Sequence, residues 1–145
     1  MQIKLTAPPL LKHETALPAS KSISNRALII HALTKGKDMP QNISDCDDTF
    51  VMVRALTQSE ETVDIMAAGT AMRFLSAYYA THEGTHVLTG TERMKQRPIG
   101  ILVEALRNLG ARIEYMEKEG YPPLRINGGL HEGGLLTLAG NMSSQ

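Results

Sequence analysis

Residues 18–26 read Pro-Ala-Ser-Lys-Ser-Ile-Ser-Asn-Arg, and this stretch predicts the start of a helix. Ser20 is a favourable N-cap residue, because its hydroxyl can accept a hydrogen bond from a free N–H group of the first turn. Apolar residues then recur at helical spacing, at Ile23, Ala27, Leu28 and Ile30. The pattern predicts a helix over residues 21–33, with Gly36 as its stop.

The same helix start is a candidate anion site. The first turn of a helix carries unpaired N–H groups and a positive dipole end, which together attract anions. Lys21 and Arg26 add charge, and a guanidinium can bind a carboxylate or phosphate through two parallel hydrogen bonds. Hydroxyl donors come from Ser20, Ser22 and Ser24. A capped surface helix with ordinary basic residues is the competing interpretation.

A second helix start follows in residues 67–73, which read Ala-Ala-Gly-Thr-Ala-Met-Arg. Gly69 would let a ligand approach the backbone closely, and the pattern predicts a helix over residues 71–80. Thr70 and Arg73 are further candidates for ligand contact. Ordinary capping and a solvent-facing arginine are the more common explanation of such a turn.

Residues 89–100 carry a run of positive charge, with Arg93, Lys95 and Arg97 at alternate positions of a predicted loop. Three cations with few local acids repel one another, and a nearby anion would relieve that repulsion. A solvated basic loop is the usual outcome of such a charge run.

The remaining pattern alternates short strands with helices. Strands are predicted at residues 2–6, 41–44, 62–66, 86–88, 112–116, 124–126 and 135–138. Two more helices are predicted, one capped by Asp45 or Asp47 and one running from Pro98 to Leu109. The first of these would bury an apolar face formed by Phe50, Val53 and Leu56. Several strands follow one another after residue 110 without a helix, which favours the α+β class over a doubly wound sheet.

The composition limits the classes of protein that the chain can represent. Its 145 residues include 15 basic and 15 acidic side chains and 42% hydrophobic residues, which suits one globular domain rather than a nucleic-acid-binding protein. Cys46 is the single cysteine, so no intrachain disulfide forms, and the histidines lack metal-ligand spacing. Without a signal-like or membrane-length apolar run, we expect a soluble cytoplasmic protein.

The last residues, 140–145, read Gly-Asn-Met-Ser-Ser-Gln and contain potential helix caps without a helix behind them. We therefore expect the chain to be a fragment of a longer protein. The hydroxyls of Ser143 and Ser144 and the amide of Gln145 can bind phosphate or hydroxyl groups, but they identify no ligand by themselves.

Several segments, in this order, resemble the EPSP synthase (3-phosphoshikimate 1-carboxyvinyltransferase) family: residues 17–28, 68–73, 93–99 and 140–145. The resemblance implies the enolpyruvyl transferase α/β prism, which is built from repeated βαβαββ units. It also implies that residues 1–13 are a strand segment that belongs to the C-terminal domain. Residues 14–145 would then form an incomplete N-terminal domain, with about two of its three repeat units.

The resemblance further implies an activity for the full-length protein. The family transfers the enolpyruvyl group of phosphoenolpyruvate to the 5-hydroxyl of shikimate 3-phosphate and releases phosphate, a step of the shikimate pathway to chorismate and the aromatic amino acids. It requires no metal or organic cofactor. We expect the full-length protein to be a monomer that binds neither nucleic acid nor membrane. The family's proton-transfer carboxylates lie in the C-terminal domain, so we expect this chain alone to be catalytically inactive.

Roles for individual residues follow from the same resemblance. The implied contacts of shikimate 3-phosphate are Lys21, Ser22, Arg26, Ser143, Ser144 and Gln145. The implied contacts of phosphoenolpyruvate, which the herbicide glyphosate would share, are Lys21, Gly69, Arg97 and Gln145. Thr70 and Arg73 also occupy motif positions, with weaker grounds for direct contact.

The chain departs from the family pattern at Ala67, where asparagine is frequent, and at Gln96, where glutamate is frequent. UDP-N-acetylglucosamine enolpyruvyl transferase is the alternative family, and Ser22 and Arg26 argue against it. A non-catalytic module that captures a phosphorylated metabolite is an alternative of another class. The abrupt end at Gln145 argues against that module.

Overall fold

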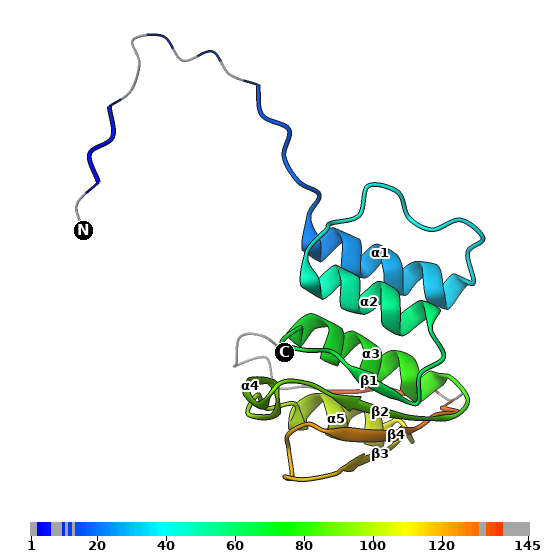
Figure 1. The fold of residues 1–145 in the computed structure, drawn as a ribbon. Helices are drawn as coiled ribbons and strands as arrows, with labels where there is room; N and C mark the ends of the chain where they lie inside the picture. The colour runs from blue at the N-terminus through cyan, green and yellow to red at the C-terminus, as the bar shows by residue number, and fades with distance from the viewer. Residues whose placement is uncertain (1–2, 7–9, 11, 13, 131–132, 138–145) are drawn as a thin grey trace.

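The computed structural model describes residues 3–6, 10, 12, 14–130 and 133–137. Figure 1 shows residues 14–20 leading into a body of helices and one sheet. The helices are α1 (Lys21–Thr34), α2 (Asp47–Thr57), α3 (Gly69–Thr81), α4 (Glu92–Lys95) and α5 (Gly100–Asn108). The strands are β1 (Thr62–Asp64), β2 (Thr85–Thr89), β3 (Arg112–Tyr115) and β4 (Leu124–Asn127). Within this described part, no helix is both long enough and apolar enough to cross a membrane.

The strands form one sheet with the order β1-β2-β4-β3. β1 and β2 are parallel and are joined through α3, whereas β4 pairs antiparallel with both β2 and β3. Along β4, the buried Leu124 and Ile126 alternate with the exposed Arg125, so one face of the sheet is apolar. The combination of a βαβ crossover with antiparallel neighbours confirms the predicted α+β class.

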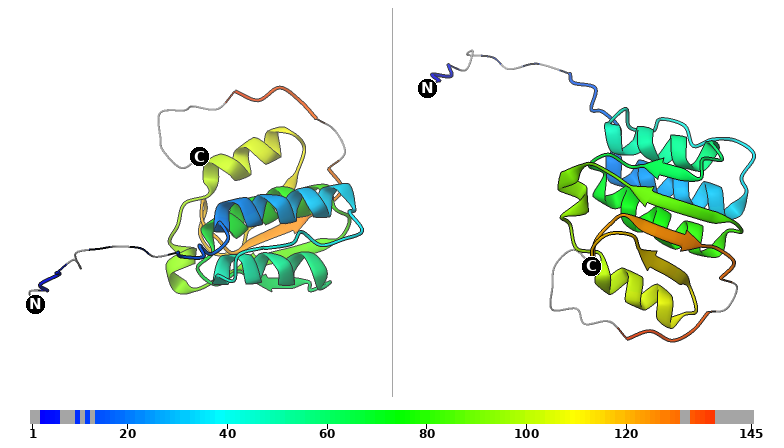
Figure 2. Two further views of the ribbon diagram at one scale, coloured as in Figure 1. Left: turned by 90° about the horizontal axis from the view of Figure 1, so that it is seen from above. Right: turned by 60° about the horizontal axis from the view of Figure 1, so that its bottom comes forward.

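α3 is the central helix of the body. It packs against α1 and α2, against α5, and against strands β2 and β4. Figure 2 shows this stacking of helices against the sheet from two further directions. The core side chains at the contacts are at most 1% exposed and include Met72, Leu75, Leu88, Val103 and Ile126. Burying a side chain of this size stabilises the fold by roughly 1.5–3 kcal/mol.

α1, α2 and α3 run side by side in the same direction (Figures 1 and 2). The connection over residues 35–46 returns the chain to the start of α2, and β1 returns it to the start of α3. The first turns of all three helices therefore lie at one edge of the body, which we call the helix-start edge. Because each helix start carries partial positive charge, the edge attracts anions before any side chain is considered.

The predicted start of α1 is confirmed, but its end differs from the prediction. The Ser20 hydroxyl accepts a hydrogen bond from the N–H group of Ile23. At the other end, Lys35 rather than Gly36 adopts the left-handed conformation, with φ of 51°. The N–H groups of both residues bond carbonyls of the last turn, which closes the helix despite the side chain on Lys35.

The predicted cap of α2 at Asp45 or Asp47 is wrong. Cys46 occupies the N-cap position and makes no side-chain capping bond. Asp47 lies in the first turn instead, where its negative charge favours the positive end of the helix. The basic run after β2 is also not a simple loop, since Thr91 caps the short helix α4 within it.

Some predicted strands are wrong where the structure describes them. Residues 41–44 form no strand, because the N–H group of Ser44 bonds the Ser24 hydroxyl rather than a neighbouring strand. Residues 3–6 and 135–137 form no strand either, and residues 2 and 138 lie outside the described part. A short strand forms only where the fold supplies a partner, which local alternation does not reveal. The assignment of residues 1–13 to another domain stays a prediction.

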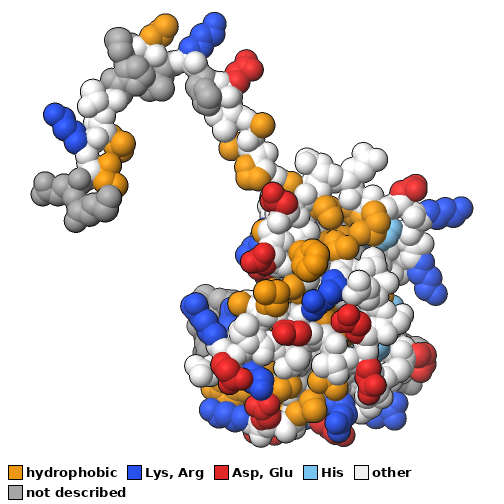
Figure 3. Space-filling view, viewed as in Figure 1, with side chains coloured by type: hydrophobic (Ala, Val, Ile, Leu, Met, Phe, Trp, Pro, Cys, Tyr) orange, Lys and Arg blue, Asp and Glu red, His pale blue; other side chains and the backbone are white. Residues whose placement is uncertain are grey.

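The predicted apolar faces of α1 and α2 are wrong in part. Ile23 and Ile30 of α1 and Phe50 of α2 are 70%, 60% and 64% exposed. Figure 3 shows apolar side chains gathering on the surface over α1 and α2. Leu28 is buried as its spacing predicts, but the residues beside it on the inner face of α1 are polar. The contact of α1 with its neighbours therefore depends on hydrogen bonds as well as on apolar packing.

Replacing Leu75 with alanine is expected to lower the free energy of unfolding by about 2–5 kcal/mol, because the change leaves a cavity between α3 and its neighbours. Urea unfolding followed by circular dichroism measures this change. Ile101→Ala on α5 is the control, because that side chain is 41% exposed. It should cost less than about 1 kcal/mol. Equal losses in the two variants would contradict the assigned core.

Candidate functional site

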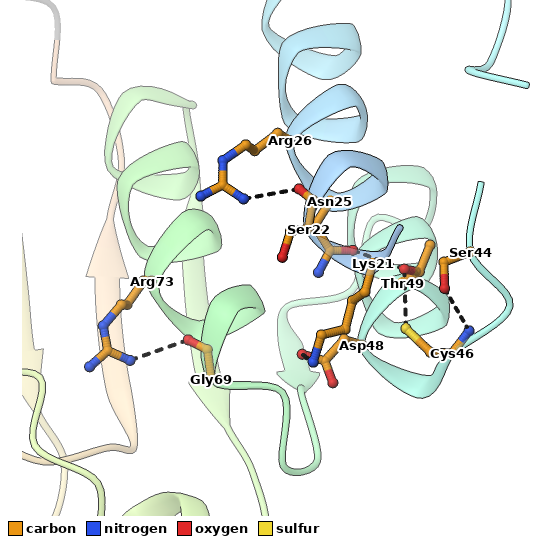
Figure 4. A network of polar contacts seen from close by, with 10 residues as sticks. All are labelled: Lys21, Ser22, Asn25, Arg26, Ser44, Cys46, Asp48, Thr49, Gly69 and Arg73. Atoms are coloured by element: carbon orange, nitrogen blue, oxygen red, sulfur yellow. Dashed lines mark hydrogen bonds and ion pairs between the residues drawn. The ribbon is translucent and has the colours of Figure 1, made fainter. Parts of the chain in front are cut away.

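The helix-start edge begins with the first turns of α1 (Figure 4), where Lys21, Ser22 and Arg26 are exposed. The Lys21 ammonium lies 3.4 Å from a carboxylate oxygen of Asp48, in the first turn of α2. Arg26 Nη1 donates to the backbone carbonyl of Ser22 at 3.0 Å, and its guanidinium lies 5.7 Å from the Phe74 ring centre on α3. The structure therefore brings the predicted residues of α1 together at one place on the edge.

A buried polar seam, formed by Ser24, Asn25, Ser44 and Thr49, joins α1 to α2. All four residues are at most 9% exposed. The Ser24 hydroxyl accepts from the Ser44 N–H group at 2.9 Å and donates to the Ser20 carbonyl at 2.9 Å. The Thr49 hydroxyl donates to Asn25 Oδ1 at 3.0 Å. Because a broken bond would leave a buried polar group unsatisfied, the seam fixes the starts of α1 and α2 relative to each other.

Cys46 borders the seam at the start of α2. Its Sγ lies 3.4 Å from the Thr49 hydroxyl oxygen, and its N–H group donates to the Ser44 hydroxyl at 3.4 Å. Desolvation raises the pKa of the thiol, but hydrogen bonds with Ser44 and Thr49 outweigh this effect and lower the pKa overall. The thiol is therefore part of the polar network that positions α2.

Two guanidiniums converge on Gly69, which opens α3. A Cβ at this residue would lie 2.3 Å from Arg97 Nη1, so the close approach requires glycine. Arg73 Nη1 donates to the Gly69 carbonyl at 3.4 Å. Desolvation, followed by the positive charge of Arg97, lowers the pKa of Arg73. Neither arginine forms a salt bridge within the described residues, so an anion at this turn would offset both charges.

The expectation that Arg93, Lys95 and Arg97 have few acidic partners is wrong for Lys95. The Lys95 ammonium lies 2.9 Å from a carboxylate oxygen of Glu117 and 3.5 Å from one of Glu92. The hydrogen bond with Glu117 is the largest of the effects that raise the pKa of Lys95. Arg93 is exposed on α4. Of the three cations, Arg97 is the one that reaches the start of α3.

The other predicted residues divide into placed and unplaced groups. Thr70 is half-buried in the first turn of α3. Ser143, Ser144 and Gln145 lie outside the described residues. Sequence reasoning missed Asp48 as the partner of Lys21, because the two residues are far apart in the chain and no local pattern links them. Across residues 14–130 and the other described positions, no three His, Cys, Asp or Glu side chains gather as a metal site.

The fold is an α/β domain with helix starts and serine hydroxyls on one edge, an arrangement that suits an anion. Among the described residues, the cations Arg26, Arg73 and Arg97 on this edge form no salt bridge. A family model described as EPSP synthase (3-phosphoshikimate 1-carboxyvinyltransferase) matches residues 5–60 and 54–145, which cover nearly the whole chain. The chain belongs to the EPSP synthase family.

Individual relatives agree with this assignment. A 3-phosphoshikimate 1-carboxyvinyltransferase of Bacteroides fragilis is 63% identical to this chain, in an alignment that covers 100% of this chain and 35% of the relative. One of Pectobacterium atrosepticum is 44% identical, over 100% of this chain and 40% of its own length. EPSP synthase from Acinetobacter baumannii has a TM-score of 0.74 at 20% identity, over 90% of this chain and 36% of that chain. This likeness confirms the predicted fold, and the chain spans about a third of its relatives' length.

Gly69→Ala is expected to displace the Arg97 guanidinium, because the new Cβ would lie 2.3 Å from Nη1. The side-chain Nε–H signal of Arg97 in an NMR spectrum should shift. The melting temperature should change little, because Gly69 is not among the residues with positive φ. Gly133→Ala is the control, since nothing lies within 4 Å of its added Cβ. An unchanged Arg97 signal in Gly69→Ala would contradict this account of the turn.

Proposed function

We propose that this chain forms mainly the shikimate 3-phosphate side of an EPSP synthase active site. The full-length enzyme would transfer the enolpyruvyl group of phosphoenolpyruvate to the 5-hydroxyl of shikimate 3-phosphate and release inorganic phosphate. Family membership and the 63% identity to a 3-phosphoshikimate 1-carboxyvinyltransferase support this substrate pair. The observation that carries the proposal is that the starts of α1 and α3, each with its own cations, open on the same edge.

The physical demand of the reaction fits such an edge. Both substrates are multiply charged anions, and they must lie side by side for the hydroxyl to reach the enolpyruvyl group. Their mutual repulsion is offset when each one lies on fixed cations and helix dipoles that need no reorganisation during the reaction. In this chain, one substrate would lie at the start of α1 and the other at the start of α3.

We assign shikimate 3-phosphate to the α1 side. The ammonium of Lys21 would lie between both substrates, released in part from Asp48, and Ser22 and Arg26 would bind shikimate 3-phosphate. The exposure of these three side chains supports the assignment, because a ligand can reach each of them. By family resemblance the remaining contacts would come from residues outside the described part: Ser143, Ser144 and Gln145.

We assign phosphoenolpyruvate, and its competitor glyphosate, to the α3 side. The first turn of α3 at Gly69 would offer backbone N–H groups, and Arg97 would bind a phosphate or carboxylate through its guanidinium. The convergence of Arg97 and Arg73, which form no salt bridge with any described residue, supports an anion here. Lys21 and Gln145 would contribute to this substrate too. Thr70 and Arg73 are weaker candidates for direct contact.

The chemistry is an addition followed by an elimination. The 5-hydroxyl oxygen loses its proton and bonds C2 of phosphoenolpyruvate, while C3 gains a proton. Loss of a proton from C3 together with loss of phosphate from C2 then restores the C2–C3 double bond. No electrons pass to an acceptor, so the step itself needs no redox cofactor. We assign the proton transfers to the part of the enzyme beyond this chain. We therefore expect this chain to bind substrate without catalysing the reaction.

Calorimetric titration of shikimate 3-phosphate into the chain tests the proposal. We expect saturable binding that Lys21→Ala weakens at least about tenfold, because a charge-assisted hydrogen bond contributes roughly 1.5–3 kcal/mol. Lys37→Ala is the matched control, since Lys37 is exposed in the connection between α1 and α2 and should not affect the affinity.

UDP-N-acetylglucosamine serves as the comparison ligand in the same titration and should show no binding. Binding of this UDP-sugar in place of shikimate 3-phosphate would favour the alternative family. Absence of binding by both ligands would contradict the proposed role of the α1 start in this chain.

A further inference from the structure

Asn25 is a buried polar residue at the α1 start, and the proposed function gives it no role. It is 0% exposed, and its Oδ1 accepts the hydrogen bond of the Thr49 hydroxyl at 3.0 Å. It follows Ser22 by three positions, so the two side chains are neighbours on the surface of α1. Asn25 thus connects the buried seam with a residue that faces the proposed substrate.

The amide nitrogen of Asn25 lacks an acceptor. Nδ2 is buried and has no hydrogen-bond partner among the described residues. Figure 4 shows the oxygen directed toward Thr49 and the nitrogen directed toward the side of α1 that carries Ser22 and Lys21. A buried donor without an acceptor destabilises a fold, and such groups call for a functional explanation. The seam itself uses only the oxygen, so it does not explain why this position carries an N–H group.

We propose that Asn25 is a positioning residue for shikimate 3-phosphate and acts through Ser22. When the substrate lies at the α1 start, the Ser22 hydroxyl donates its hydrogen to a substrate oxygen. The hydroxyl oxygen then accepts a hydrogen bond from Asn25 Nδ2. The inference rests on the proposed function, since shikimate 3-phosphate is the ligand that completes this relay.

The chemistry of a hydroxyl group supports the relay. A serine hydroxyl has one hydrogen to donate and two lone pairs to accept, so it can do both at once. A hydroxyl that accepts a hydrogen bond becomes a better donor, because the bonds polarise one another. The bond from Thr49 fixes the Asn25 amide by its oxygen and so fixes the direction of the N–H groups. Asn25 would therefore orient the Ser22 hydroxyl without touching the substrate.

A double-mutant cycle of Asn25→Leu and Ser22→Ala tests the relay through the calorimetric affinity for shikimate 3-phosphate. We expect Asn25→Leu to weaken binding by about twofold or more in the parent chain, because the interaction energy of two residues in contact is about 0.5 kcal/mol or more. In the Ser22→Ala background, Asn25→Leu should have no further effect. An equal loss of affinity on Asn25→Leu in the parent and in the Ser22→Ala background would overturn the inference. The same loss of affinity in Thr49→Val would show that the role of Asn25 is purely structural.

NMR of the Asn25 side-chain amide gives a second readout that needs no change at Asn25. Saturating shikimate 3-phosphate should move the Nδ2 signals in the parent chain and leave them unmoved in Ser22→Ala. Movement in both chains, or in neither, overturns the relay. If the parent chain does not bind shikimate 3-phosphate, the proposed function fails and the inference fails with it. If the parent binds and the signals stay unmoved, only the inference fails.

Discussion

The structure depends on the parallel packing of α1, α2 and α3, which places three helix starts on one edge. Parallel helix dipoles lying side by side repel one another. This arrangement therefore needs contacts that hold the helices in register and negative charges that offset the positive charge of the helix starts. The seam of Ser24, Asn25, Ser44 and Thr49 supplies directional hydrogen bonds between α1 and α2. Asp48 supplies one negative charge at the edge, and a bound anion would supply further negative charge.

Local signals in the sequence were sufficient to predict the start of α1 and the α+β class. The Ser20 cap depends on contacts within one turn, so the sequence around it carries all the necessary information. The same holds for Gly69, where a small residue at a helix start permits the approach of another group. Lys21, Ser22 and Arg26 lie in the first turns of α1, as the sequence predicts. Their role in ligand binding stays a prediction.

Contacts between distant residues could not be predicted from single positions. Asn25 and Thr49 are 24 residues apart, and neither one signals its partner. The same limit explains why Lys95 was grouped with Arg97, since its partner Glu117 lies on a different loop. Residues 41–44 alternate like a strand, yet the seam takes the N–H group of Ser44. Each of these errors arises where tertiary contacts override a local pattern.

The central claim is that the starts of α1 and α3 form one anion-binding edge. The most direct test is an NMR titration of the chain with phosphoenolpyruvate, followed through the backbone amide signals at constant ionic strength. The account predicts shifts concentrated at residues 69–72, accompanied by a shift at Lys21, which saturate together with one dissociation constant. Shifts that are spread over the surface, or that saturate separately at the two helix starts, would contradict it.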